Sequence, residues 1–139
     1  TYTRDQLSWK YRHCEGWQPG IIVEAGFSWP LRPQAGILER VKEANRERLK
    51  KQPLDKPSCG SVFRNPEGAK AGQLIEACGL KGFQVGAAQV SDKHANFIVN
   101  LGSATARDTD SLIKTVVDTV LKKTGYRLQT EVVYLGDWA

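Results

Sequence analysis

The feature that most constrains the fold is a run of six apolar side chains that recur at helical spacing near the end of the chain. They are Leu112, Ile113, Val116, Val117, Val120 and Leu121. An apolar stripe of this width must be buried against a second layer. Asp108 and Thr109 precede the stripe, and Lys122, Lys123 and Gly125 follow it, as the helix dipole and a glycine cap favour. The pattern predicts a long helix that opens after Asp108 and Thr109 and closes at Gly125.

Shorter patterns predict the elements that this helix would cover. Strands are expected over residues 21–27, 82–91, 96–101 and 127–136, with a short strand or turn within 59–68. Further helices are expected over 33–51 and 69–78, and Gly79 follows the second one as a left-handed cap. The predicted fold is α+β, with a small mixed sheet covered by two helices over residues 53–129. A strand and a helix within residues 1–52 precede it, and residues 130–139 form a terminal strand.

The beginning of the chain suggests that an upstream part is missing. The sequence contains no Met, and the strand expected at 21–27 has no obvious local partner. We therefore expect its partner strands to lie upstream.

Composition narrows the class of protein. The net charge is +5 with a pI near 9.2, which fits nucleic acid, a membrane surface or a nucleotide diphosphate equally well. No apolar run is long enough for a membrane helix or a signal peptide. Cys14, Cys59 and Cys78 are odd in number and form no CxxC pair, which favours a reducing compartment. With only His13 and His94 as histidines, no metal site is expected.

Two side chains in the second half of the chain stand out, although each has a simple alternative explanation. Gly60-Ser61 allows a backbone to approach a ligand and displays a hydroxyl, but an isolated Gly-Ser is more often an ordinary turn. Glu131 lies in an apolar strand, either at an exposed edge or in a pocket where a cation holds it. The edge is the better explanation for the residue taken alone.

Four other polar residues are open to similar alternatives. Arg12 lies in a basic and aromatic cluster that fits either nucleic-acid stacking or a frayed terminus. Lys51 ends a cationic helix whose charges are mostly solvated. Asn65 begins an Asn-Pro turn, and His94 lies in a polar stretch typical of an exposed histidine.

Longer motifs change this balance. The segments PSCGSVFRNP (57–66), SDKHANFIVN (91–100) and LQTEVVYLG (128–136) closely resemble the MurB family of UDP-N-acetylenolpyruvoylglucosamine reductases. The resemblance covers nearly the whole chain and looks like the family's second type. It implies that residues 1–52 are the end of a FAD-binding domain with a linker helix, that 53–129 are the substrate-binding domain, and that 130–139 return to the flavin domains.

The resemblance also implies roles for the six candidate residues. Ser61 matches the family's proton donor, Glu131 its C-terminal acid and Arg12 its arginine, which makes them the catalytic candidates. Lys51 and Asn65 match substrate-contacting positions, and His94 stands where some members have glutamine. The implied cofactors are FAD and NADPH, with most FAD contacts upstream of this chain.

The implied reaction is the cytoplasmic reduction of UDP-N-acetylglucosamine enolpyruvate during peptidoglycan synthesis, without nucleic acid or membrane partners. The chain would need the missing N-terminal flavin-binding domains for activity. Two alternatives remain. The chain binds the UDP-sugar without catalysing a reaction, or it is a basic nucleic-acid-binding domain, for which no recognition motif is present.

Overall fold

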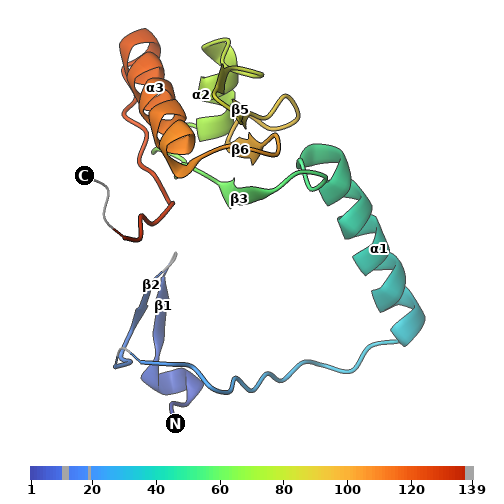
Figure 1. The fold of residues 1–139 in the computed structure, drawn as a ribbon. Helices are drawn as coiled ribbons and strands as arrows, with labels where there is room; N and C mark the ends of the chain where they lie inside the picture. Colours follow the sequence, from blue (N-terminus) through green and yellow to red (C-terminus); the bar gives the residue numbers. More distant parts are fainter. Residues whose placement is uncertain (11–12, 19, 137–139) are drawn as a thin grey trace. The chain divides into compact units, whose positions relative to one another are not determined.

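The computed structural model describes residues 1–10, 13–18 and 20–136. Contacts divide the chain into two compact units, Thr1–Pro33 and Gln34–Ala139. Figure 1 shows the elements of both units.

The first unit contains a short hairpin that the sequence analysis did not predict. A 3-10 helix, η1 (Arg4–Gln6), is followed by strands β1 (Ser8–Lys10) and β2 (His13–Glu15). The strands are antiparallel, and Lys10 Nζ lies 2.6 Å from Glu15 Oε1. The strand expected over 21–27 does not form in the described structure, and Ile21 and Val23 are 91% and 92% exposed. A strand requires an adjacent backbone edge, and the described residues provide none for this segment.

The second unit begins with helix α1 (Gln34–Lys51), close to the predicted bounds. None of its residues is buried. Its expected apolar stripe is partly exposed, and Leu38 retains 53% of its accessible surface.

A four-stranded sheet forms the centre of this unit. Its strands are β3 (Ser58–Ser61), β4 (Gln84–Val85), β5 (Ala88–Val90) and β6 (Phe97–Asn100), in the order β3-β6-β5-β4. The described strand pairs are all antiparallel. The α+β class is therefore confirmed, whereas the expectation of a mixed sheet was wrong.

Two predicted strands differ from the structure. Residues 82–91 fold into the β4–β5 hairpin rather than one strand, because Gly86 adopts φ +55° and turns the chain between Val85 and Ala88. Residues 127–136 form no continuous strand, and only Thr130 makes a bridge, to Phe63.

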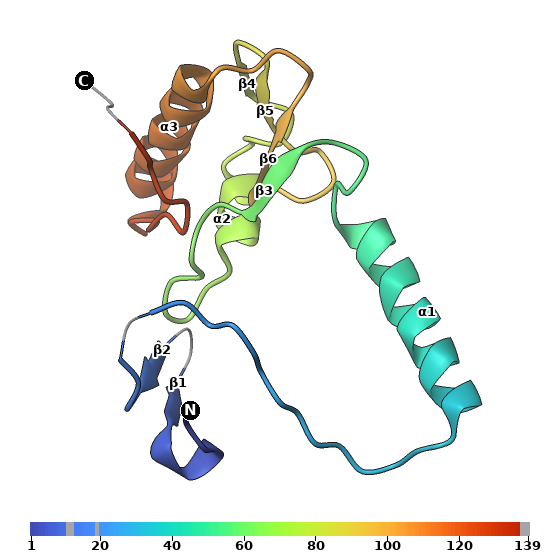
Figure 2. The same cartoon turned by 60° about the horizontal axis from the view of Figure 1, so that its bottom comes forward.

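Helices α2 (Ala71–Ala77) and α3 (Ala106–Thr124) cover the sheet and contact each other (Figure 2). Gly79 and Gly125 both adopt left-handed conformations after these helices, with φ of +75° and +77°, as predicted. Helix α3 begins earlier than predicted. Thr105 is its N-cap, and Asp108 completes a reciprocal capping box at the third helical position.

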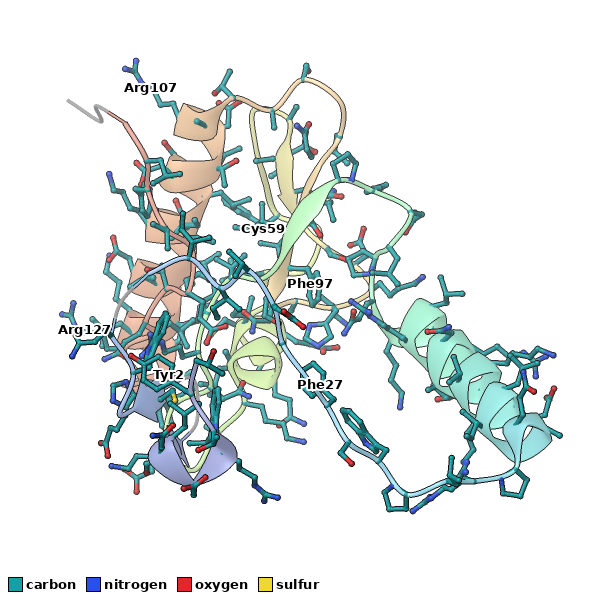
Figure 3. The ribbon with its side chains drawn as sticks, turned by 90° about the horizontal axis from the view of Figure 1, so that it is seen from below. Tyr2, Phe27, Cys59, Phe97, Arg107 and Arg127 are labelled. Carbon is teal, nitrogen blue, oxygen red and sulfur yellow. The ribbon has the colours of Figure 1, made fainter. Side chains whose placement is uncertain are left out.

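The core lies between the two helices and the sheet. Four of its residues, Leu112, Ile113, Val116 and Val120, come from the predicted face of α3. The others come from α2, the sheet and the segments beside them, namely Val62, Phe63, Ala71, Ile75, Cys78, Leu80, Ala88, Val90, Ala95, Ile98 and Leu128. At about 25 cal/mol per Å² of buried apolar surface, this cluster is the main stabilising feature of the unit. Figure 3 shows Arg107 and Arg127 at opposite ends of α3.

The C-terminal segment is held against α3. The Tyr134 hydroxyl donates to Asp110 Oδ1 at 3.2 Å, and Lys114 Nζ lies 2.7 Å from Asp110 Oδ2. Partial burial raises the pKa of Tyr134, and the Asp110 carboxylate adds to the increase. This contact connects the segment after Thr130 to the first half of α3.

Candidate functional site

Ser61 lies at an irregular point of the sheet. The register between β3 and β6 changes between Ser58, which faces Val99, and Ser61, which faces Phe97. Gly60 adopts φ +84° between them, a conformation that favours glycine. Cys59 and Phe97 are labelled on these neighbouring strands in Figure 3. The irregularity leaves Ser61 exposed at the end of β3.

The backbone of the three residues after Ser61 makes hydrogen bonds along both of its edges. On one side, Val62 O accepts the Glu131 N–H at 2.7 Å, and the Arg64 N–H donates to Gln129 O at 2.8 Å. On the other side, Asn96 Oδ1 accepts the Phe63 N–H at 3.0 Å. The pairing places Glu131 opposite the residue that follows Ser61. Two catalytic candidates from distant parts of the sequence thus have neighbouring backbones.

The Glu131 side chain is largely buried. Its exposed fraction is 10%, and Oε1 lies 3.9 Å from Arg64 Nε. The structure therefore does not place this carboxylate at an exposed edge, and a cation lies beside it, as the second explanation from the sequence requires. The sequence analysis did not predict that cation, because the two residues meet only through the pairing of 62–64 with 129–131.

Asn65 has a clear structural contact. Its Oδ1 accepts the Ala71 N–H at 3.0 Å, at the first residue of α2. This bond satisfies one of the amide groups that a helix start leaves without an intrahelical acceptor. The carboxamide Nδ2 can still donate to another group.

His94 is held by three contacts. Its ring Nδ1 accepts the backbone N–H of Asn96 at 3.2 Å, and the ring meets Phe97 edge-on at a centroid distance of 5.0 Å. Its backbone N–H donates to Ser91 Oγ at 3.3 Å. Gly72 is also close, because a Cβ at that position would lie 3.1 Å from His94 Cε1. A neutral ring that accepts at Nδ1 carries its proton on Nε2. His94 therefore presents a donor rather than an acceptor to any ligand that reaches Nε2.

Lys51 is the last residue of α1, and its side chain is 73% exposed. Its Nζ lies 3.4 Å from Glu47 Oε2. The hydrogen bonds from Lys50 and then from Lys51 hold the pKa of Glu47 below its usual range. An exposed ion pair of this kind is weak, so Lys51 can exchange Glu47 for another anion at small cost.

A hydrogen bond connects the last turns of α1 to the turn before β6. Lys93 Nζ donates to Leu49 O at 2.9 Å. Lys93 also lines an open pocket of about 130 Å³, together with Pro53, Asp55, Lys56, Gln89, Ser91, Asp92 and Val99. This hydrogen bond joins Leu49, two residues before Lys51, to Lys93, which directly precedes His94.

Arg12, the third catalytic candidate, lies outside the described residues. Among the residues that are described, no group of three or more His, Cys, Asp or Glu side chains could hold a metal ion. Within the same residues, no helix has both the length and the apolar character needed to cross a membrane.

The fold and these contacts define a small α+β domain with a serine and a carboxylate on paired segments. The comparisons identify its family. A family model described as "UDP-N-acetylenolpyruvoylglucosamine reductase, C-terminal domain" matches residues 52–135. The chain belongs to this family.

Relatives and one solved structure agree with this assignment. A UDP-N-acetylenolpyruvoylglucosamine reductase from Synechococcus elongatus is 48% identical over 99% of this chain and 46% of its own length. One from Agathobacter rectalis is 45% identical over 99% of this chain and 44% of its own length. The crystal structure of the Thermus caldophilus enzyme matches 94% of this chain and 46% of its own, with 39% identity and a TM-score of 0.77. The chain thus spans about half the length of these relatives.

Proposed function

We propose that the full-length protein containing this chain reduces UDP-N-acetylglucosamine enolpyruvate to UDP-N-acetylmuramate, with NADPH and FAD, for peptidoglycan synthesis. The chain would supply the substrate-binding domain, over residues 53–129. The observation that carries the proposal is the pairing of Val62 with Glu131, which brings the segments of Ser61 and Glu131 together within the family match. NADPH and nucleotide sugars are cytoplasmic metabolites, so the reaction is assigned to the cytoplasm.

The cofactors are assigned mostly outside this chain. The pocket at Lys93 has a volume of about 130 Å³, below the roughly 300–1,000 Å³ of sites for larger ligands. Neither FAD nor NADPH fits within it. Most contacts to these cofactors would come from the half of the relatives' length that this chain does not span, and bound FAD would supply the hydride. The residues of this chain would act on the sugar nucleotide.

Ser61 is assigned the proton donation. An alcohol is too weak an acid to protonate an ordinary leaving group, but a carbanion next to a carboxylate is basic enough to take its proton. Hydride addition to the enolpyruvyl methylene carbon creates such a carbon beside it. The exposed position of Ser61 at the end of β3 is consistent with access to a bound ligand.

Glu131 and Arg12 are assigned the stabilisation of the negative charge that develops on the substrate. Arg12 would face the enolate, and Glu131, protonated or hydrogen-bonded to Arg12, would support the same oxygen-rich group. The Glu131 side chain is 10% exposed, which is consistent with this role because electrostatic interactions strengthen where water is excluded.

Lys51, Asn65 and His94 are assigned to substrate binding. The exposed ammonium of Lys51 suits a phosphate or carboxylate. Asn65 Nδ2 and His94 Nε2 would supply hydrogen-bond donors. The hydrogen bond from Lys93 to Leu49 connects the segments of Lys51 and His94, which is consistent with both residues binding the same substrate.

The test separates the two half-reactions in the full-length protein with FAD bound. Ser61→Ala is expected to leave flavin reduction by NADPH unchanged and to slow reduction of the sugar nucleotide by about 10²- to 10⁴-fold. Ser58→Ala changes the same residue type at the other end of β3 and is the matched control. Equal rates of both half-reactions in Ser61→Ala and wild type would remove Ser61 from this role.

A second candidate function applies to residues 1–139 alone. The chain spans only about half of its relatives' length, which favours binding of the UDP-sugar without turnover. Calorimetric titration with the UDP-sugar would measure this binding. Flavin absorbance in the purified chain would contradict this second candidate.

A further inference from the structure

We infer that Asn96 is a positioning residue that holds Ser61 and Glu131 in their relative places. The inference rests on the proposed function. It concerns a side chain whose hydrogen bonds go to the backbone of Phe63, between the two proposed catalytic groups.

The Asn96 side chain acts in place of a strand. Its Oδ1 accepts the Phe63 N–H at 3.0 Å, and its Nδ2 donates to Phe63 O at 2.9 Å. One carboxamide therefore satisfies both backbone groups of Phe63, as an opposing residue in a sheet would do. Strand β6 begins only at Phe97, so the side chain extends the pairing of this edge by one residue.

The main chain of Asn96 contributes to the same arrangement. Asn96 O accepts the Val62 N–H at 2.9 Å, and the Asn96 N–H donates to His94 Nδ1 at 3.2 Å. Asn96 is 6% exposed and is one of two buried polar residues in the described part of the chain. Its hydrogen bonds are therefore shielded from competing water.

The bonds of Asn96 act on the segment that separates the two catalytic candidates. Glu131 is bonded through Val62 O, on the opposite edge of the same segment. Gly60, on the other side of Ser61, has φ +84° and no heavy atom within 4 Å of the place where a Cβ would stand. The backbone before Ser61 thus lacks close packing at Gly60. Ser61 is placed by its pairing with Phe97 together with the hydrogen bonds at Val62 and Phe63.

A purely structural role for Asn96 makes a different prediction. It would lower the amount of folded protein but leave the chemistry of each folded molecule unchanged. A positioning role changes kcat for sugar-nucleotide reduction in folded protein, because a shift of about 1 Å in a reacting group can cost roughly 100-fold.

The experiment uses the full-length protein with FAD bound and two variants of Asn96. Asn96→Asp keeps the acceptor and replaces the donor to Phe63 O, and Asn96→Ala removes both. Asn100→Ala is the matched control, because Asn100 is the last residue of β6 and its side chain also makes two hydrogen bonds to the backbone, with Oδ1 accepting the N–H groups of Gly102 and Ala104.

In both Asn96 variants, kcat for sugar-nucleotide reduction is expected to fall roughly 10- to 100-fold. Flavin reduction by NADPH and the KM for the sugar nucleotide should stay near wild type. The solvent deuterium isotope effect on kcat should rise, because proton transfer becomes slower. Asn100→Ala should lose stability without any of these changes.

A separate measurement needs neither variants nor turnover. In wild-type residues 1–139, the Phe63 amide should exchange with deuterium as slowly as the β6 amides, and rapid exchange would overturn the inference. If both Asn96 variants showed the wild-type kcat and the wild-type isotope effect, the inference would also be overturned. Absence of sugar-nucleotide reduction in the wild-type holoenzyme would instead contradict the proposed function.

Discussion

Arg64 Nε lies 3.9 Å from Oε1 of Glu131, although residues 65–130 separate the two in the sequence. The two side chains meet because Arg64 donates its backbone N–H to Gln129 and Val62 accepts that of Glu131. Arg64 is largely exposed while Glu131 is largely buried. The acid therefore lies at the boundary between the core and the surface that a ligand can reach.

Replacing Glu131 by Gln should lower sugar-nucleotide reduction in the full-length holoenzyme by about 10²- to 10³-fold, the range for loss of one well-placed electrostatic group. Stopped-flow absorbance of the flavin would measure the two half-reactions separately. Glu67→Gln changes an exposed acid within the same family match and should leave both rates unchanged. A Glu131→Gln enzyme with the wild-type rate would exclude the carboxylate from the chemistry.

Replacing Leu112 by Ala should lower the free energy of unfolding by about 3 kcal/mol, because its side chain is completely buried and its loss leaves a cavity. Urea denaturation of residues 1–139 would measure the change. Leu38→Ala, on the exposed face of α1, is the control and should change the unfolding midpoint little. Similar losses in both variants would show that the core is not centred on α3.

Two glycines should respond to alanine in opposite directions. Gly125 has φ +77°, so Gly125→Ala should destabilise the second unit by about 1 kcal/mol. Gly36 lies within α1, and a Cβ there would meet no atom within 4 Å. Gly36→Ala should therefore stabilise the helix by about 0.5 kcal/mol. Circular dichroism during thermal unfolding would measure the change in stability of each variant. Changes of the same sign in both would contradict the left-handed conformation of Gly125 or the helical one of Gly36.

Replacing Asp108 by Asn should destabilise the protein in a pH-dependent way. The hydrogen bond from the Thr105 N–H, with a further one from the Thr105 hydroxyl, holds the pKa of Asp108 below its ordinary 3.8. A lowered folded-state pKa means that the ionised carboxylate stabilises the folded state. This contribution is present above about pH 4 and is lost as pH falls through the lower folded-state pKa.

Unfolding curves of wild type and Asp108→Asn should therefore differ at about pH 7 and converge near pH 2. Asp118→Asn, at an exposed position within the same helix, should show no such convergence. A difference that is independent of pH would mean that the capping box does not depend on the charge of Asp108.

Local patterns predicted the helices well. The spacing of Leu112, Val116 and Val120 identified the buried face of α3, and Gly79 and Gly125 marked helix ends, because both signals lie within a few residues. The start of α3 was placed too late, since Asp108 was taken to precede the helix, whereas it caps the helix from its third position.

Strands were predicted less well, because each one requires a partner that its own residues do not specify. Residues 21–27 and 127–136 have similar apolar patterns to real strands, yet only Thr130 finds a bridge. The hairpin at Gly86 was missed because a glycine inside an apolar run was taken as part of one strand. The glycine at position 86 was itself the sequence signal that could have divided the run into two strands.

The candidate site was predicted in part. The family resemblance selected Ser61 and Glu131, while the residues taken alone favoured a turn and an exposed edge. Arg64 and Asn96 were missed, since both act through contacts with distant residues. A polar residue immediately before the apolar run 97–99 was the one local sign that Asn96 is unusual.

The pairing of Val62 and Arg64 with residues 129–131 also has a consequence for biosynthesis. A ribosome completes α2, the hairpin and α3 before it adds the amides and carbonyls that close this edge. Until then the backbone around Phe63 has an open side towards solvent. The nascent domain would therefore gain resistance to proteases at this edge only once residues 129–131 have been added, so the site would be assembled after the scaffold that surrounds it.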